Sequence, residues 1–219
     1  MILDVYLHGR RHQPANWQDT ELFITALMEN RPEPEPRPGA EPVTGRLAHA
    51  LTEVFQSLPP ATWPYGGQSA EFTFTQRPEG STGGLLDFDG YLHAAVNAQT
   101  GHGALKWMLT RRSTVVMDPA IADQVWLSDN PAPPTKDPNV IADPGFPLYH
   151  HPRSTLPVDR IRAAVEEYCR AGTGHRPTCI DWTAGQLPGR RLDSPVAEAY
   201  ITHCEDPWCE IPEPQHPAH

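Results

Sequence analysis

The sequence lacks any apolar run of the ~20 residues that a helix needs to cross a bilayer. Its first residues, Met1–Leu7, have no basic segment, and Asp4 interrupts their apolar character, so they do not resemble a signal peptide. We therefore expect a cytoplasmic protein that makes no membrane contact. In that compartment the four cysteines are expected to be reduced thiols rather than a disulfide framework.

Basic clusters are also missing. The only lysines are Lys106 and Lys136, and no run of basic residues is longer than the pairs at 10–11, 111–112 and 190–191. The formal net charge is -10. Because nucleic-acid binders usually carry a basic patch, no nucleic-acid partner is expected. An acidic protein is suited to attract a basic protein, although acidity also simply keeps a protein in solution.

Motifs that would indicate catalysis are absent. The chain has no G-x-x-x-x-G-K-[ST] or G-x-G-x-x-G phosphate-binding loop and no G-x-S-x-G nucleophile elbow. It also lacks the deaminase combination of H-x-E with P-C-x-x-C. His102 and the pair His150-His151 are candidates for a general base, but isolated histidines more often pack or lie in loops. We therefore expect neither an enzyme nor a cofactor.

A metal site is the strongest alternative to that expectation. Its candidate ligands lie towards the C-terminus: Cys169, His175, Cys179, His203, Cys204 and Cys209. Zinc usually takes four Cys or His ligands in closely spaced pairs. Cys204 and Cys209 are separated by four residues, and the other two cysteines lie on elements where buried free thiols are common. A structural zinc is therefore not expected, and a small metal-dependent or hydrolytic enzyme that uses this set remains the alternative function.

Proline is abundant, with 26 residues against an average of about 5%. The prolines concentrate at 31–42, at 131–152 and from 207 to the end. Alternate prolines at 31–42 remove backbone donors, so this segment is predicted to be an extended, polyproline-like loop. We interpret it as a spacer, and the alternative is an adaptor protein whose proline-rich loops bind partners.

The remaining pattern predicts an α+β fold. Residues 2–7 indicate a strand, and Asn16 can cap a helix whose buried side carries Leu22, Phe23, Ala26 and Leu27. A second helix is predicted from Thr44 to Leu58 by a continuous apolar stripe that Pro59 ends.

From Ser69 to Met117 the apolar period changes to two, which predicts an antiparallel β-meander packed against about three helices. Its strands are expected at 71–75, 85–89, 91–98 and 104–109, with 113–117 extending or following the last, and with a turn at Gly101-His-Gly103. The face that carries Asp87 and Asp89 is expected to meet water or a partner. Trp126 is placed on a further short strand.

The best-defined unit runs from Pro157 to Trp182. Pro157 suits the first helical position, and Gly172 suits a left-handed C-terminal cap. Val158, Ile161, Val165 and Tyr168 share one face of this helix. Thr178–Trp182 has the β-branched and aromatic character of a return strand.

This unit resembles the C-terminal signature of immunity protein family one of bacterial polymorphic toxin systems. The resemblance is carried by the helix led by Pro157, the turn at Gly172, the Arg176-Pro177 step and the strand that ends at Trp182. A weaker similarity extends back to about Ser69. The resemblance implies an α+β protein that binds and neutralises a cognate toxin domain, and the toxins paired with this family are thought to modify nucleic acid, as deaminases or nucleases do.

We expect one domain over residues 1–182 and a partly irregular extension over 183–219, with a short helix between Ser194 and His203. The residues expected to contact the toxin are Asp87, Asp89, Asp181 and Trp182. The alternative for the three carboxylates is that they are solvated strand residues, and for Trp182 that it packs the core. Pro157, Gly172, Arg176 and Pro177 are interpreted as structural, with Arg176 donating to backbone carbonyls around its turn or contacting a partner.

Overall fold

The computed structural model describes residues 2–30, 67–75, 90–109, 113, 115, 117–122, 124–143 and 148–194. The proline-rich loop at 31–42, the helix at 44–58, Asp87, Asp89 and the chain beyond residue 194 lie outside these ranges. The strands are β1 (Ile2–Leu7), β2 (Arg10–His12), β3 (Gln68–Thr75), β4 (Gly90–Asn97), β5 (His102–Leu109), β6 (Val125–Asp129), β7 (Ile141–Asp143), β8 (Leu148–Tyr149), β9 (Thr155–Pro157) and β10 (Asp181–Gly185). The helices are α1 (Trp17–Met28), α3 (Pro119–Ala122), the single 3-10 turn η1 (Pro152–Ser154) and α4 (Val158–Ala171).

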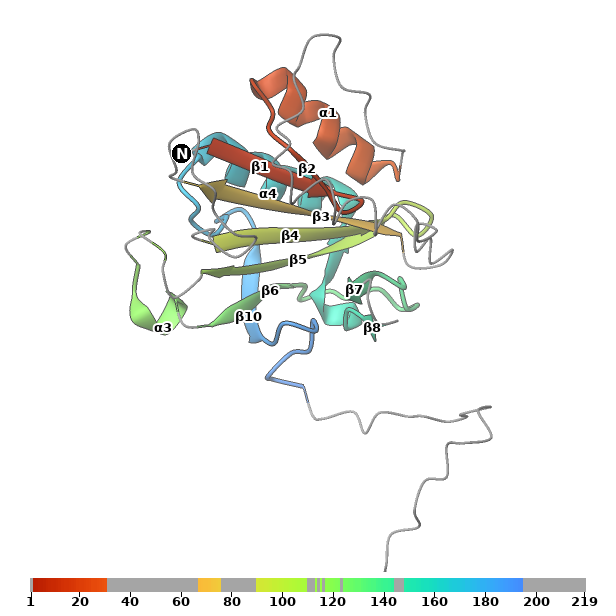
Figure 1. Cartoon of the computed structure of the whole chain (residues 1–219). Coiled ribbons are helices and arrows are strands. Elements are labelled where there is room, and N and C mark those ends of the chain that lie inside the picture. Colours follow the sequence, from red (N-terminus) through yellow and green to blue (C-terminus); the bar gives the residue numbers. More distant parts are fainter. Residues whose placement is uncertain are drawn as a thin grey trace, which may run out of the picture.

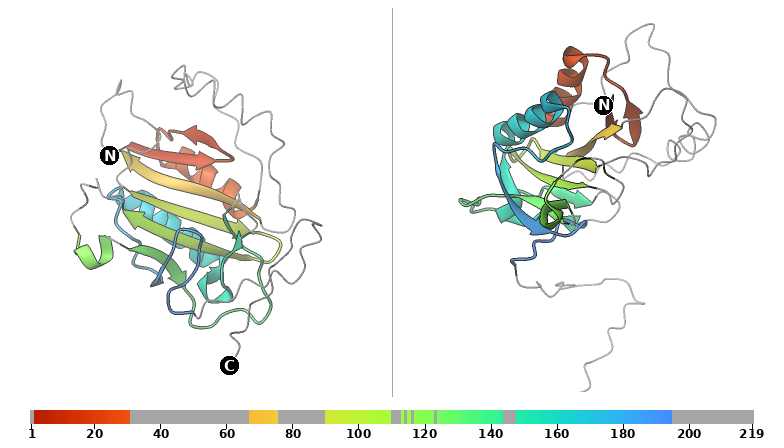
Figure 2. Two further views of the ribbon diagram at one scale, coloured as in Figure 1. Left: turned by 60° about the horizontal axis from the view of Figure 1, so that its bottom comes forward. Right: turned by 90° about the vertical axis from the view of Figure 1, so that its left-hand side faces the viewer.

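The predicted α+β class is confirmed by the arrangement of these elements (Figure 1). Eight strands form one antiparallel sheet in the order β10-β6-β5-β4-β3-β1-β2, with β9 paired to β5. Helices α1 and α4 lie together on one face of this sheet, as the side view in Figure 2 shows. Alternate residues of β3, β4 and β5 point at the helices and form the main core, for example Phe72, Leu92 and Trp107. No described helix has the length and apolar character that a membrane span requires.

Helix α1 begins where the sequence predicts it. The side chain of Asn16 accepts a hydrogen bond from the backbone N–H of Asp19 at 3.0 Å, which satisfies one of the free donors of the first turn. The predicted buried side is wrong in one respect. Leu22 is 50% exposed, whereas Ile24 and Leu27 are buried. The buried side is therefore centred on Ile24, and Leu22 lies about half a turn away from it.

The central hairpin joins β4 to β5 in register, with Ala95 opposite Ala104. Its turn ends at Gly101, which has a φ of 69°, and His102 already belongs to β5. The turn predicted at residues 101–103 is thus placed two residues too late. Gly103 pairs with Val96 within the strand, and a glycine fits there because an added Cβ would lie 2.6 Å from the carbonyl oxygen of Ala95. Of the segment 113–117, the described residues 113, 115 and 117 belong to no strand.

The α4 unit, which consists of helix α4, the following turn and strand β10, forms as predicted at Pro157–Trp182 except that the helix and the strand each begin later. Pro157 is the N-cap rather than the first helical residue, because it also ends β9, opposite His102. Gly172 has the expected left-handed conformation, with a φ of 62°. The return strand starts at Asp181 rather than Thr178 and continues to Gly185.

Ser128 bridges the point where β5 changes its neighbour from β9 to β6. Ala104 pairs with Thr155 of β9, and Lys106 pairs with Leu127 of β6. Between them, the N–H of Leu105 donates to the Ser128 hydroxyl at 2.9 Å. That hydroxyl in turn donates to the carbonyl of Ser154 at 2.6 Å. The fully buried Ser128 side chain therefore supplies the hydrogen bonds that neither neighbouring strand provides.

Ser128→Ala is expected to lower the free energy of unfolding by about 1–3 kcal/mol, because it leaves the Leu105 N–H buried without an acceptor. Urea unfolding followed by tryptophan fluorescence measures this change. Ser69→Ala, at a half-buried position on β3, serves as the matched control and is expected to change the stability by no more than about 0.5 kcal/mol. Equal stability of the two variants would contradict the role given to the Ser128 hydroxyl.

Candidate functional site

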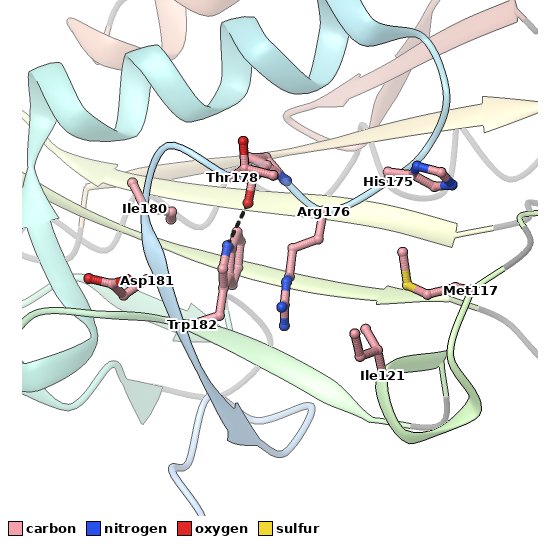
Figure 3. Close-up of a pocket in the computed structure, with 9 residues that line it drawn as sticks. Met117, Ile121, His175, Arg176, Thr178, Ile180, Asp181 and Trp182 are labelled. Atoms are coloured by element: carbon pink, nitrogen blue, oxygen red, sulfur yellow. Dashed lines mark hydrogen bonds between the residues drawn. The ribbon is translucent and has the colours of Figure 1, made fainter.

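A groove of about 460 Å³ lies beside the return strand of the α4 unit (Figure 3). One wall comes from the segment ahead of β6 and from α3, and the other comes from the loop between α4 and β10. The residues that line it are Met117, Ile121, His175, Arg176, Pro177, Thr178, Ile180, Asp181 and Trp182. The lining is thus mixed, with apolar side chains around one guanidinium and one carboxylate.

Glu167 of α4 sets the path of the loop that forms this groove. Its carboxylate accepts hydrogen bonds from the N–H of Thr178 at 2.7 Å, from the Thr178 hydroxyl at 2.8 Å and from the N–H of Cys179 at 3.0 Å. These bonds hold residues 178–179 back against the helix. The chain therefore becomes a strand only at Asp181, which explains why the strand predicted from Thr178 begins three residues later.

Two tryptophans lie near the guanidinium of Arg176: Trp182, which lines the groove, and Trp126 of β6, which does not. The indole N–H of Trp182 donates to the carbonyl of Pro177 at 2.8 Å, and that of Trp126 donates to the carbonyl of Ile121 at 2.9 Å. The guanidinium carbon of Arg176 lies 4.2 Å from the centroid of the Trp126 ring and 5.7 Å from that of Trp182. Cation–π attraction of this kind orients a guanidinium without neutralising its charge.

The structure brings four of the residues singled out in the sequence into this one groove: Arg176, Pro177, Asp181 and Trp182. Asp181 is exposed on the outermost strand of the sheet, and Trp182 is half-buried against the core. Pro157 and Gly172 lie at the two ends of α4 instead. The other two expected contact residues, Asp87 and Asp89, are outside the described ranges.

The described thiols are poorly suited to bind metal or attack a substrate. Burial raises the pKa of Cys169 to about 12, and burial together with the carboxylate of Glu167 raises that of Cys179 to about 11. Both are therefore protonated at neutral pH, whereas a metal ligand or nucleophile is a thiolate. Within the described ranges, no three His, Cys, Asp or Glu side chains come together as a metal site. His203, Cys204 and Cys209 lie outside those ranges.

A second polar cluster, which no sequence motif marks, crosses the sheet face opposite the helices. Tyr6, Glu71, His93 and Lys106 lie opposite one another on the four neighbouring strands β1, β3, β4 and β5. Residues paired in this way project from the same face. His93 and Lys106 are only 4% and 6% exposed. The period-two alternation places Glu71 away from the core, but the sequence does not predict that the strand of Glu71 lies between those of Tyr6 and His93.

Burial shifts the titration of this row. It raises the pKa of Glu71 and lowers the pKa of Lys106, in each case against the attraction of nearby opposite charges. The ammonium of Lys106 donates to the carbonyl of Leu187 at 2.7 Å and to that of Ala142 at 3.4 Å. These bonds connect the chain beyond β10 to the centre of the sheet. The contacts of Lys106 are thus structural.

Arg191 forms a third polar feature, which lies outside Pro157–Trp182. Its side chain is fully buried and is paired with two carboxylates. It forms two hydrogen bonds of 2.8 Å to Asp193 and an ion pair of 2.7 Å with Asp129 of β6. It also donates to the carbonyl of Arg153 at 3.1 Å. Residues 191–193 are therefore anchored to the sheet and to the turn before β9.

The fold and the groove together define a two-layer α+β scaffold with a mixed apolar and charged surface at one end. A family model described as Immunity protein Imm1 matches residues 8–184. Because this match covers most of the chain, the protein belongs to the Imm1 family of immunity proteins. The match confirms the resemblance seen at Pro157–Trp182 and extends it through α1, for which the sequence analysis had no motif. Neither a curated protein nor a solved structure matches the chain.

Proposed function

We propose that this protein binds and neutralises the toxin of a polymorphic toxin system in the cytoplasm, by surface complementarity and without catalysis. The observation that carries the proposal is the family match, which covers both long helices, the strands from β2 to β9, most of β10 and the groove. The groove is the favoured contact surface because it combines a half-buried tryptophan with exposed charge. Such a combination is typical of binding hot spots.

The charge of the chain favours a basic partner. With a formal net charge of -10, the protein attracts a positively charged surface at long range and speeds the encounter. A toxin that modifies nucleic acid, such as a deaminase or a nuclease, carries such a surface to hold its substrate. We therefore propose a toxin of this class as the partner.

Co-expression tests the proposed function directly. Cells that produce the toxin encoded beside this gene are expected to survive when the full chain is also produced, and the two purified proteins are expected to form a stoichiometric complex in calorimetry. Failure of the full chain to protect the cells, together with no measurable complex, would overturn the proposal.

Asp181→Arg is expected to weaken the complex at least tenfold, about 1.4 kcal/mol, because it places a positive charge against a basic toxin surface. Glu21→Arg is the matched control, since it makes the same charge reversal at an exposed position on α1, at the opposite end of the sheet from β10 (Figure 1). Calorimetric titration of both variants measures the effect. A loss of affinity that is equal in the two variants would show that only the net charge matters and would remove Asp181 from the contact surface.

A further inference from the structure

Arg176 is the one charged group at the centre of the groove, and its charge is not matched there. No described residue forms an ion pair or a hydrogen bond with its guanidinium, and its Nη1 atom is buried without a hydrogen-bond partner. The carbonyl contacts expected for Arg176 around its turn are not formed. Asp181, the acidic residue of the groove, points away from Arg176 on the far side of Trp182 (Figure 3).

Other arginines of the same protein show the usual arrangement. Arg191 has the carboxylates of Asp129 and Asp193, and Arg11 makes two hydrogen bonds of 2.9 Å to Asp4. A guanidinium keeps its positive charge at any physiological pH, so its partial burial is unfavourable unless an anion or several acceptors face it. The two indoles supply attraction to Arg176 but accept no hydrogen bond of its N–H groups.

The position of Arg176 is suited to an external anion. Its stacking on Trp126 restricts the guanidinium, so little side-chain entropy is lost when a ligand binds. Met117, Ile121 and Ile180 line the same groove and limit access of water, which strengthens an ionic hydrogen bond. A planar carboxylate fits the donor fork of a guanidinium with two parallel hydrogen bonds.

We propose that Arg176 is the receptor for a carboxylate of the bound partner, supplied either by an Asp or Glu side chain or by a free C-terminus. That the partner is a toxin rests on the function proposed above, whereas the binding of a carboxylate at Arg176 does not. On an acidic protein this contact would determine which of several basic partners binds. A basic toxin is attracted by the overall charge, and only one that presents a carboxylate at the groove satisfies Arg176.

The carboxylate site can be tested on the full chain without the toxin. Three small probes are titrated at constant ionic strength while the indole N–H signals of Trp126 and Trp182 are followed by NMR. They are N-acetyl-glutamate α-amide, which carries a side-chain carboxylate, N-acetyl-leucine, which carries a terminal carboxylate, and N-acetyl-glutamine α-amide, which is neutral. We expect saturable shifts with at least one carboxylate probe, with a dissociation constant on the order of millimolar, and none with the neutral probe. The probe that binds more tightly identifies the source of the carboxylate.

Two variants and one control identify the receptor. Arg176→Gln is expected to abolish the saturable shifts, and Arg176→Lys, which keeps the charge but loses the fork, to weaken binding about tenfold. Arg170→Gln is the control, because the guanidinium of Arg170 also stacks on an indole, 3.5 Å from the centroid of Trp17, but lies outside the groove. The inference would be overturned if the shifts persisted unchanged in Arg176→Gln. It would also be overturned if neither carboxylate probe produced saturable shifts in the original chain. Circular dichroism of each variant shows whether it is folded. If Arg176→Gln does not fold, the weakened binding expected of Arg176→Lys tests the inference in its place.

Binding of the neighbouring toxin separates this inference from the proposed function. Arg176→Gln is expected to weaken the complex at least tenfold, whereas Arg170→Gln should change it less than twofold. A toxin that binds the original chain and Arg176→Gln equally well contradicts the inference and leaves the proposed function standing. A toxin that does not bind at all contradicts the proposed function, and the carboxylate titration still decides the inference.

Discussion

Replacing both Asp129 and Asp193 with asparagine is expected to lower the free energy of unfolding by about 3–5 kcal/mol, because the Arg191 guanidinium would remain buried without a counter-charge. The side chain of Arg191 is 0% exposed, whereas those of Asp129 and Asp193 are 28% and 41% exposed. The cost of breaking this cluster therefore depends on which partner remains. An isolated guanidinium in the interior is much less favourable than two carboxylates that water can reach.

This asymmetry provides an internal control for the first prediction. Arg191→Met alone is expected to cost less, about 1–3 kcal/mol, because the two carboxylates that it leaves behind are partly hydrated. Adding Arg191→Met to the double asparagine variant should restore part of the lost stability, since it removes the buried charge. Urea unfolding of the four proteins measures these differences. A triple variant that is no more stable than the double variant would show that the loss does not come from the isolated charge.

The cluster also ties the segment after β10 to the sheet. Asp129 lies on β6 and Arg153 precedes β9, and both contact Arg191. Beyond β10, the N–H of Leu192 donates to the carbonyl of Ala184 at 3.0 Å. Residues 183–193 are thus held by the sheet. The division into one domain over residues 1–182 and an extension over 183–219 stays a prediction. A chain that ends at Trp182 is expected to be less stable because it lacks these contacts.

The features that the sequence predicted well depend on residues close together in the chain. Asn16 caps α1 through a contact three residues away, and Gly172 ends α4 through its own left-handed conformation. Such signals depend on local stereochemistry, which is the same in any fold. The β-meander was likewise predicted, because alternation of polar and apolar residues reports a half-buried strand directly.

The features that were missed or shifted depend on partners far along the chain. The start of β10 is delayed by Glu167, which lies eleven residues before Thr178. Trp126 stacks on Arg176 across about fifty residues, and Asp129 meets Arg191 across about sixty. No pattern in a single sequence specifies such pairs, because they follow from the order of strands in the sheet. The groove could therefore be predicted only on its Arg176–Trp182 side.

Acidification from pH 7 to pH 5 is expected to lower the free energy of unfolding by about 4 kcal/mol through two buried histidines, His93 and His150. They are 4% and 1% exposed. Among the described residues, neither ring nitrogen of His150 nor Nδ1 of His93 has a hydrogen-bond partner. Burial and the charge of Lys106 lower the pKa of His150 to about 3, and the same two causes, with His150 itself, hold the pKa of His93 well below its ordinary value.

The sign follows from proton uptake. Below the ordinary histidine pKa of about 6.5 the unfolded chain binds two protons that the folded chain does not, so stability falls by about 1.4 kcal/mol per pH unit for each histidine. The loss begins near pH 6.5 and continues down to the folded-state pKa values. Glu71 acts in the opposite direction, because burial raises its pKa and its protonation favours the folded state. The contribution of the histidines is therefore obtained from differences between variants.

Urea unfolding at pH 7, 6 and 5 measures this dependence in the original chain and in three variants. His93→Gln and His150→Gln are each expected to remove about half of the histidine contribution, and the double variant to remove nearly all of it. Glu71→Gln should instead steepen the loss, because it removes the group that opposes it. If the double variant lost stability between pH 7 and pH 5 as steeply as the original chain, the two histidines would not be the groups that exclude protons from the folded protein.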